Sequence, residues 1–505
     1  SGGTYRDRGA IEELVAGLRG HGIPADVVHV DPWWMRWRRY CDYRWDEESF
    51  PHPQEFIDGL HRQGLRLCLW EHPYISVESD LFDHGVARGY FALKPDGSPY
   101  VFDYGLSIAP RPDGAVRKAA EGDSWNARVA VIDLTNAEAS GWFKDLHRPL
   151  LRMGVDVFKT DFGEDIPEDA VFSNGMTGRT MHNLYPLLYN EAVFGVTREE
   201  NGAGIVWGRS GTAGSQRYPV CWSGDPAADF ESLASTVRGG LSAGMSGIPF
   251  WSNDIGGYRG TPDPELYVRW AQFGLLCSHS RMHGDSPREP WHFGDEACRI
   301  VRDFVKLRYR LFPYLYSTAY EATGGMPVLR ALPLVYPDDP NAYGKDFEFL
   351  VGPWILAAPI YRRGERTSAG SYRCTRKVYL PEGSWYDYWE GMRFEGPGTL
   401  DVDAPLERIP LYLKGGAILP MMEFAPRIPQ ERVDPLIVDL YPEGESRYAF
   451  REDEGTTEFR CVKEKDRIIV EWKGEMSRKI EVRIRGKKAG AWAAKEQQLT
   501  IVDGQ

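Results

Sequence analysis

The sequence predicts an α/β fold, a (β/α)8 TIM barrel whose first strand is missing, followed by two all-β sandwich domains. Three observations lead to this prediction. Amphipathic stretches alternate with short apolar runs up to about residue 320. Three of those runs end in an aspartate with tryptophan or phenylalanine close by. After Gly324 the chain changes to short strand-like runs separated by turn residues.

The barrel strands are expected to be short, buried and apolar, with polar residues at their carboxyl ends. Seven candidates follow one another: Asp26–Asp31, Leu65–Trp70, Val155–Asp161, Gly204–Trp207, Val220–Asp225, Gly247–Trp251 and Leu275–Ser280. A (β/α)8 barrel needs eight strands. The chain opens on a turn and an amphipathic stretch from Arg8 to Arg19. We therefore expect strand one to precede Ser1, and the chain to be a fragment cut just after it.

One interval of the barrel region is too long for a simple connection. Between Trp70 and Val155 the chain is rich in Gly, Pro, Tyr and Asp. Loops of that length inside compact domains are usually functional. We expect a small inserted subdomain at about 74–130, on the face that carries the site, within a barrel that covers 1–323.

The sequence after residue 323 predicts two β domains, at 324–423 and 424–505. The first should contain strands near Phe347–Val351, Ile355–Ile360 and Val378–Leu380. The second should contain Leu436–Leu440, Arg467–Trp472 and Ile480–Ile484.

Composition excludes several classes of function. A net charge of -13 argues against nucleic acid or an anionic membrane as the main partner. No run in this sequence approaches membrane-spanning length, and we expect no signal peptide. The seven cysteines are dispersed, without a C-x-x-C pair, which favours reduced thiols and a cytoplasmic location. The sequence has no Walker loop, dinucleotide fingerprint or histidine pair with metal-ligand spacing. The sequence leaves open whether the protein forms a homo-oligomer.

Asp161 stands where a buried strand should open into a site. It suits a nucleophile that attacks an anomeric carbon, or equally a structural aspartate that binds loop amides. Lys159 lies two residues earlier, on the same side of the strand. A lysine beside a carboxylate keeps it ionised at neutral pH, as a nucleophile requires. Glu164 and Asp165 are expected to be solvated or structural.

Asp225 ends another strand candidate, after Trp222. An apolar, aromatic setting raises a carboxyl pKa, so Asp225 suits a general acid. The alternative is a helix cap, because Asp225-Pro226 fits an N-cap with proline at the first helical position. Paired carboxylates beside aromatic rings indicate a sugar pocket that breaks glycosidic bonds.

Other polar residues fall at the same strand ends. Asp31 and Asp254 suit hydrogen bonds to sugar hydroxyls, and the planar fork of Arg209 suits holding a carboxylate. For each of these residues alone, the sequence favours a structural role over a role in the site. Their shared location on one barrel face shifts the balance toward the site.

Four motifs together resemble glycoside hydrolase family 31. They are Lys159-Thr160-Asp161-Phe162-Gly163-Glu164, Trp222-Ser223-Gly224-Asp225, Phe250-Trp251-Ser252-Asn253-Asp254-Ile255-Gly256-Gly257 and Ser280-Arg281-Met282-His283-Gly284. The resemblance runs through essentially the whole chain, and the K-T-D-F-G-E form resembles the α-xylosidase branch.

The resemblance implies a retaining exo-α-glycosidase without metal or organic cofactor. It implies Asp161 as the nucleophile and Asp225 as general acid and base, with carboxyl groups about 5–5.5 Å apart. It also implies a first sugar subsite formed by Asp31, Trp33, Trp70, Lys159, Arg209, Trp222, Asp254 and His283. The expected partner is an oligosaccharide or other α-glycoside, with neither nucleic acid nor membrane.

The chain departs from the family at a few positions. Family members usually have His where Asn253 stands, and Pro32 replaces a residue that is often small or Cys in α-xylosidases. Alternatives therefore stay open. They are an α-glucosidase or α-glycosyltransferase on the same scaffold, a non-catalytic carbohydrate-binding protein, and a fragment that is inactive without its N-terminal domain.

Overall fold

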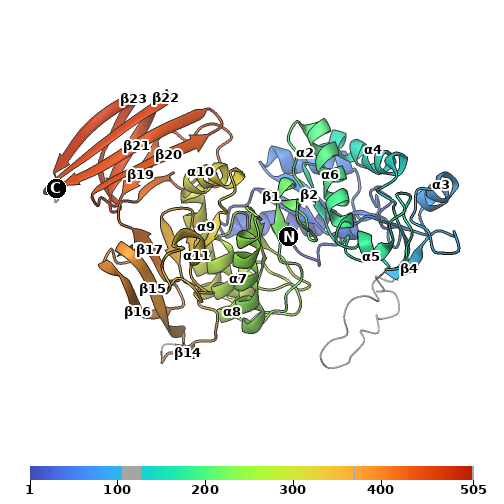
Figure 1. Ribbon diagram of the computed structural model, residues 1–505, viewed down its shortest axis with the longest axis horizontal. Helices are drawn as coiled ribbons and strands as arrows, with labels where there is room; N and C mark the ends of the chain where they lie inside the picture. The colour runs from blue at the N-terminus through green and yellow to red at the C-terminus, as the bar shows by residue number, and fades with distance from the viewer. Residues whose placement is uncertain (105–126, 369, 503–505) are drawn as a thin grey trace. The chain divides into compact units, whose positions relative to one another are not determined.

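The computed structural model describes residues 1–104, 127–368 and 370–502 (Figure 1). The chain divides into two compact units. Unit 1 comprises Ser1–Gly17 and Ala25–Trp222, and unit 2 comprises Leu18–Pro24 and Ser223–Gln505. The first helix, α1 (Arg8–Gly20), belongs to unit 1 up to Gly17 and to unit 2 from Leu18.

Unit 1 contains a parallel sheet in the order β1-β2-β6. Its strands are β1 (Val27–Val30), β2 (Arg66–Glu71) and β6 (Val157–Thr160). They confirm the first three predicted segments as parallel strands. In the register, Val30 pairs with Leu69 and Trp70 pairs with Lys159. The carboxyl ends of β2 and β6 therefore lie side by side, as parallel strands require.

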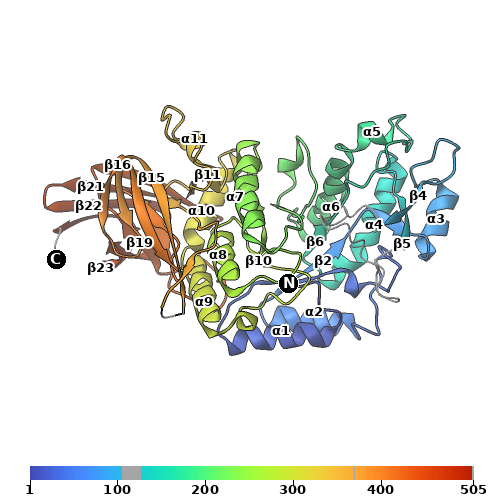
Figure 2. The same ribbon diagram turned by 90° about the horizontal axis from the view of Figure 1, so that it is seen from below.

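The helices of unit 1 include two long ones that lie next to each other, α4 (Ala137–Met153) and α6 (Tyr185–Asn201) (Figures 1 and 2). Arg148 on α4 forms ion pairs with Glu199 and Glu200 on α6, both at 2.7 Å. The shorter helices are η1 (Pro32–Trp34), α2 (Pro53–Arg62), α3 (Asp80–Arg88), α5 (Gly178–Met181) and η2 (Ser215–Arg217).

The interval between β2 and β6 carries a separate antiparallel sheet in the order β3-β5-β4. Its strands are β3 (Tyr74–Ser76), β4 (Val101–Tyr104) and β5 (Ala127–Val131). This sheet lies in the range of the expected insertion, of which residues 105–126 lie outside the described residues.

The fourth predicted barrel strand, Gly204–Trp207, is wrong as a strand. Trp207 N–H donates to the Phe158 carbonyl, but among the described residues the only bridge nearby is an isolated one between Gly208 and Cys221. A strand needs successive paired residues, which this segment lacks. The fifth prediction is confirmed only in its centre, as β7 (Cys221–Trp222).

Unit 2 begins with helices and very short strands. Its helices are α7 (Phe230–Met245), α8 (Pro264–Gly274), η3 (Pro290–Phe293), α9 (Asp295–Arg310), α10 (Phe312–Thr323) and α11 (Leu332–Val335). Its first strands are β8 (Trp251–Ser252), β9 (Asp254–Ile255) and β10 (Arg281–Met282), of which β9 and β10 are parallel neighbours.

The last two predicted barrel strands are placed too early. Ile248 N–H bonds back to Ala243, and Leu275 N–H to Ala271, so both apolar runs begin as turns that close the helices α7 and α8. A short apolar run does not distinguish a buried strand from a buried helix end. The strands start later, at Trp251 and Arg281.

The rest of unit 2 forms two larger sheets, as the predicted strands of both β domains indicated. The seven-stranded sheet contains β11 (Leu329–Ala331), β12 (Phe349–Val351), β13 (Ile355–Ala357), β14 (Glu365–Arg366), β15 (Tyr372–Asp387), β16 (Arg393–Pro405) and β17 (Leu411–Lys414). The six-stranded sheet contains β18 (Ile418–Met421), β19 (Leu436–Leu440), β20 (Glu445–Glu452), β21 (Gly455–Glu464), β22 (Arg467–Ile484) and β23 (Lys487–Val502).

Pairing in these sheets is antiparallel except between β19 and β22, which run parallel. The predicted strands Arg467–Trp472 and Ile480–Ile484 belong to the single long strand β22. Helix α10 packs beside β20, where Tyr448 donates a hydrogen bond to Ser317 at 3.0 Å (Figure 1). A continuous apolar core joins α7–α10 to both sheets.

The sequence predicted reduced cysteines and no membrane-spanning segment. All seven cysteines are free thiols, as their spacing predicted. Among the described residues, no helix combines the length and apolar character that crossing a membrane requires.

Candidate active site

Asp161 directly follows β6 and is 4% exposed. Its Oδ2 accepts hydrogen bonds from Trp70 Nε1 at 2.8 Å and Lys159 Nζ at 2.9 Å. Its Oδ1 accepts from Arg209 Nη1 at 3.1 Å and from the Phe162 N–H at 2.9 Å. The side chain thus has four donors, three of which the sequence had placed in the site. The predicted same-side arrangement of Lys159 and Asp161 is confirmed.

These donors fix the charge of Asp161. Burial alone raises its pKa, but the positive charges of Lys159 and Arg209, together with the hydrogen bonds from Lys159 and Trp70, outweigh burial. The pKa of Asp161 is therefore held well below its usual range. The carboxyl group is therefore buried and ionised at neutral pH, the state that an oxygen nucleophile requires.

The chain turns sharply after Asp161, which places the carboxylate at the strand end. Phe162 adopts φ +58°, in the left-handed region that non-glycine residues rarely occupy, and Gly163 follows at φ +94°. A Cβ on Gly163 would lie 3.1 Å from the Ser210 hydroxyl. The Tyr74 hydroxyl accepts from the N–H groups of Gly163 and Asp165 and holds the turn.

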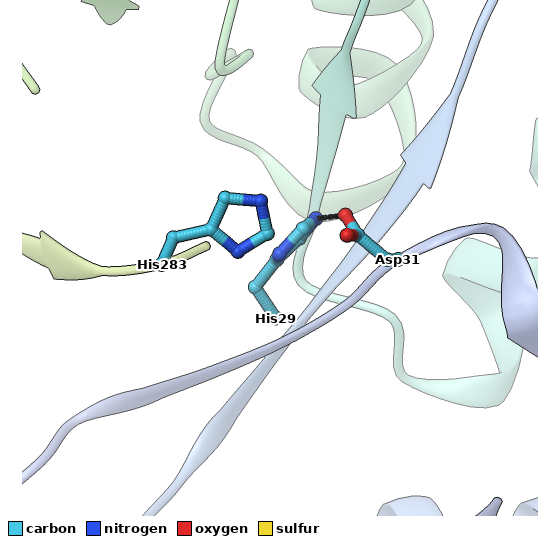
Figure 3. Close-up of side chains that lie close together, drawn as sticks. All are labelled: His29, Asp31 and His283. Carbon is cyan, nitrogen blue, oxygen red and sulfur yellow. Dashed lines mark ion pairs between the residues drawn. The ribbon is translucent and has the colours of Figure 1, made fainter. Parts of the chain in front are cut away.

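Asp31 joins the same cluster through Lys159. Lys159 Nζ lies 3.8 Å from Asp31 Oδ1, and His29 Nε2 lies 3.6 Å from the same oxygen. Figure 3 shows the His29 and Asp31 side chains, with this ion pair as a dashed line. All three side chains are buried. Sequence reasoning missed His29, although its position two residues before Asp31 places both on the same side of a strand.

Arg209 bridges two carboxylates. Its Nη2 lies 2.9 Å from Glu164 Oε1, while its guanidinium lies 4.3 Å from the centroid of the Phe162 ring. Glu164 is a direct partner of Arg209, which fits the structural role, one of the two alternatives expected for it. Burial raises the pKa of Glu164, and Arg209 opposes that effect.

The predicted aromatic residues of unit 1 divide into two groups. Trp222 is buried, and its ring faces Lys159 Nζ at 4.7 Å from the centroid. Trp207, which was not among the predicted site residues, packs edge-on against Trp222 at 6.3 Å. Trp70 binds Asp161 directly.

Trp33 is held by its own neighbours. Its Nε1 donates to the Gly3 carbonyl at 2.8 Å, and its ring stacks on Trp37 with centroids 5.5 Å apart. The Arg6 guanidinium lies 4.6 Å from the same ring. The ring of Trp33 therefore already has two partners within unit 1.

In unit 2, Asp225 lies in a loop and is half-buried. It does not cap a helix: α7 begins five residues later, and its N-cap is Asp229, whose side chain accepts from the Ser232 N–H at 2.7 Å. The alternative role for Asp225 is wrong, because Asp229 satisfies the first turn of α7.

Asp254 and His283 are both buried in unit 2. Asp254 lies on β9 and accepts from Arg281 Nε of β10 at 2.9 Å. The His283 ring packs against Tyr258, with centroids 5.2 Å apart. Arg281 is a partner that sequence reasoning missed. It stands in the Ser280-Arg281-Met282-His283 motif, but only the register of β9 against β10 reveals that it faces Asp254.

Comparison with known proteins gives matches along most of the chain. Residues 1–318 match the model of the glycosyl hydrolases family 31 TIM-barrel domain, and residues 325–419 match that of the glycosyl hydrolase family 31 C-terminal domain.

The chain is similar to two curated α-xylosidases. It is 34% identical to the α-xylosidase of Emericella nidulans, over 83% of this chain and 51% of that protein. It is 37% identical to the α-xylosidase XylQ of Lactiplantibacillus pentosus, over 77% of this chain and 48% of that protein. The chain thus spans about half the length of these relatives.

Among solved structures, the chain is similar to a family 31 dextranase of Flavobacterium johnsoniae in complex with glucose. The TM-score is 0.85 at 29% identity, and the match covers 96% of this chain and 62% of the dextranase chain.

Proposed function

Because the chain belongs to glycosyl hydrolase family 31, we propose that it forms the catalytic part of a retaining exo-α-glycosidase that removes terminal α-linked xylose from oligosaccharides. The observation that carries the proposal is the buried, ionised Asp161 with Lys159, Trp70 and Arg209 around it. The similarity to two α-xylosidases supports xylose as the sugar.

The proposal includes the architecture expected from the sequence. Residues 1–323 form a (β/α)8 barrel with an insertion at about 74–130, and 324–423 and 424–505 form two β-sandwich domains. The parallel β1-β2-β6 sheet and the match to a TIM-barrel domain model support the barrel. The two large sheets of unit 2 support the β domains.

In the proposed first step, an oxygen of Asp161 attacks the anomeric carbon while the bond from that carbon to the leaving oxygen breaks. Asp225 gives its proton to the leaving oxygen. In the second step Asp225 takes a proton from water, the water oxygen bonds to the anomeric carbon, and the ester to Asp161 breaks. The separation of the two carboxyl groups stays a prediction.

The hydrogen bonds of Asp161 suggest how a lone pair becomes available for attack. A carboxylate has about four lone-pair sites, and four donors bond Asp161. One donor must therefore move when the sugar binds. Arg209 has the longest contact, at 3.1 Å, its side chain is 22% exposed, and Glu164 offers it a second carboxylate. We assign the movement to Arg209.

The proposed first subsite uses the polar and aromatic side chains that the sequence indicated. Carboxylates accept bonds from sugar hydroxyls, and indole rings pack on sugar faces. Asp31 is anchored by His29 and Lys159, and Asp254 by Arg281, so both would meet the sugar in fixed positions. The full proposed set is Asp31, Trp33, Trp70, Lys159, Arg209, Trp222, Asp254 and His283.

The second candidate is an α-glucosidase or α-glucosyltransferase on the same scaffold. The similarity to a dextranase solved with glucose favours it. Glucose differs from xylose by a C6 hydroxymethyl group, so the wall of the pocket at that carbon decides between the two sugars.

The deciding experiment compares p-nitrophenyl α-D-xyloside with the α-D-glucoside, using the full-length protein that contains this chain. We expect kcat/KM to favour the xyloside by roughly 10- to 200-fold, the discrimination that a closed apolar wall provides. A preference for the glucoside would replace xylosidase by the second candidate. NMR of the first-formed sugar checks retention, and a β-anomer released first would contradict the mechanism.

Removal of the Lys159 charge should shift the pH dependence. The positive charge of Lys159 lowers the pKa of Asp161, so Lys159→Met should raise that pKa. The nucleophile must be ionised, and activity is lost as pH falls through its pKa. The acidic limb of the kcat/KM profile should therefore move to higher pH. Lys144→Met is the control, because Lys144 pairs with Glu199 between α4 and α6. An unmoved limb in Lys159→Met would contradict the electrostatic role of Lys159.

A further inference from the structure

At the end of β2, unit 1 contains a buried histidine–glutamate pair that the proposed chemistry does not use. His147 Nε2 lies 2.6 Å from Glu71 Oε2, and both side chains are 0% exposed. The Tyr189 hydroxyl donates to Glu71 Oε1 at 3.2 Å. His147 comes from α4, Tyr189 from α6 and Glu71 from the last position of β2. The pair therefore links one strand end to the two long helices.

The hydrogen bonds define the proton arrangement of the pair. His147 Nδ1 lies 2.8 Å from the Phe143 carbonyl oxygen, which only accepts, so Nδ1 carries a proton. The contact at Nε2 is then either an imidazolium with a carboxylate or a neutral imidazole with a carboxyl group. The rings of Tyr43, Phe143 and Phe158 enclose the imidazole, each with a centroid 4.8 Å away.

Stability alone does not account for such a pair. Burying two ionisable groups costs desolvation, and apolar residues of similar volume are often as stable or more so. Helices α4 and α6 are already joined by surface ion pairs and by packing. The position of the pair is better explained by the contacts that the Glu71 backbone and the neighbouring Trp70 side chain make with Asp161.

Glu71 is connected to Asp161 in two ways. Its carbonyl accepts the Asp161 N–H at 3.0 Å. Its sequence neighbour Trp70 points to the opposite side of the strand and donates to Asp161 Oδ2 at 2.8 Å. Trp70 on β2 and Lys159 on β6 are register partners and share that oxygen, so a shift of the end of β2 would move the Trp70 donor away from the Lys159 donor.

We propose that Glu71, held by His147, is a positioning residue that fixes the end of β2 and thereby orients the Asp161 carboxylate for attack. This inference rests on the proposed glycosidase function. The buried pair acts on the rate of the chemical step through Trp70 and the Asp161 backbone, without touching the sugar. Its loss should lower kcat and leave KM almost unchanged.

The test replaces the pair by apolar residues, Glu71→Met with His147→Leu, in the full-length protein. A fluorinated α-glycosyl fluoride that traps the nucleophile counts active sites, and kcat is expressed per trapped site. We expect kcat to fall on the order of 100-fold, the cost of a misplaced reacting group. The trapping rate should fall in parallel. Glu71→Gln, which can still accept from Tyr189 and donate to His147, should restore most of kcat.

The matched control is another buried ion pair, Glu348 with Arg376 at 3.0 Å in unit 2, replaced by Glu348→Met with Arg376→Met. It should change Tm without changing kcat per site. A folded Glu71→Met/His147→Leu variant with wild-type kcat would overturn the inference. If that double variant does not fold, Glu71→Gln and His147→Gln decide. Wild-type kcat per site in His147→Gln together with a slow Glu71→Gln would also overturn it. Failure of the wild type on every α-glycoside would instead refute the proposed function.

Discussion

Replacement of Asp161 by Asn is expected to lower kcat on the order of 10⁴-fold, as losses of one member of a catalytic unit do. The amide has nearly the same shape but does not attack the anomeric carbon. Its nitrogen also faces donors, since Lys159, Trp70, Arg209 and the Phe162 N–H all point at this side chain. The variant should still fold, because β6 keeps its apolar packing. Steady-state kinetics and circular dichroism check both parts.

The matched control for Asp161 lies just before the opposite end of the same strand. Asp156 precedes β6, pairs with His61 at 2.9 Å and Arg66 at 2.8 Å, and accepts the Leu67 N–H. Asp156→Asn should lower Tm and leave kcat unchanged, because residues at the amino-terminal end of barrel strands serve stability. Wild-type turnover in Asp161→Asn, with mass spectrometry excluding reversion to Asp, would show that the nucleophile is another residue.

Replacement of Asp225 by Ala should give a loss that depends on the leaving group. Oligosaccharides need a proton on the departing oxygen, so their turnover should fall by about 10²- to 10⁴-fold, the usual contribution of a general acid. Aryl glycosides with good leaving groups should still form the covalent intermediate, which then accumulates. Azide needs no general base and should restore turnover of these substrates.

The configuration of the azide product separates the two aspartates. With Asp225→Ala, azide attacks the β-linked intermediate and gives the α-glycosyl azide. With Asp161→Ala, azide attacks the α-glycoside directly and gives the β-glycosyl azide. Asp229→Ala is the control for Asp225. It removes the N-cap of α7 and should cost about 1 kcal/mol of stability without affecting turnover. An identical loss for oligosaccharide and aryl substrates in Asp225→Ala would contradict the acid–base role.

The strand ends of unit 1 were largely predictable from local sequence. The apolar runs before Asp31, Trp70 and Asp161 became β1, β2 and β6 because a buried parallel strand is recognisable from its own few residues. The pairing of Lys159 with Asp161 also followed from the two-residue period of a strand. The rule that a short apolar run predicts a buried strand failed at Leu275–Ser280, where the run closes helix α8.

The choice between roles for Asp225 needed the structure. The sequence Asp225-Pro226 fits a helix cap and a loop carboxylate equally well. Whether Asp225 or Asp229 caps helix α7 depends on where the chain enters the helix. The structure gives that position to Asp229. The partners of Arg209 likewise depend on the left-handed turn at Phe162, which no periodicity in the sequence indicates.

By itself, the sequence determined the family, the two carboxylates proposed for catalysis and the lysine that keeps one of them ionised. Each of these is recognised from a short motif of residues that are neighbours in the sequence. Only the tertiary structure decided that Glu71 meets His147, that Arg209 is shared between Asp161 and Glu164, and that Arg281 faces Asp254. The physical reason is that such contacts join residues that are distant in the sequence. Arg281 is 27 residues from Asp254, and His147 is 76 residues from Glu71. Their geometry depends on which strands pair and which helices cover them.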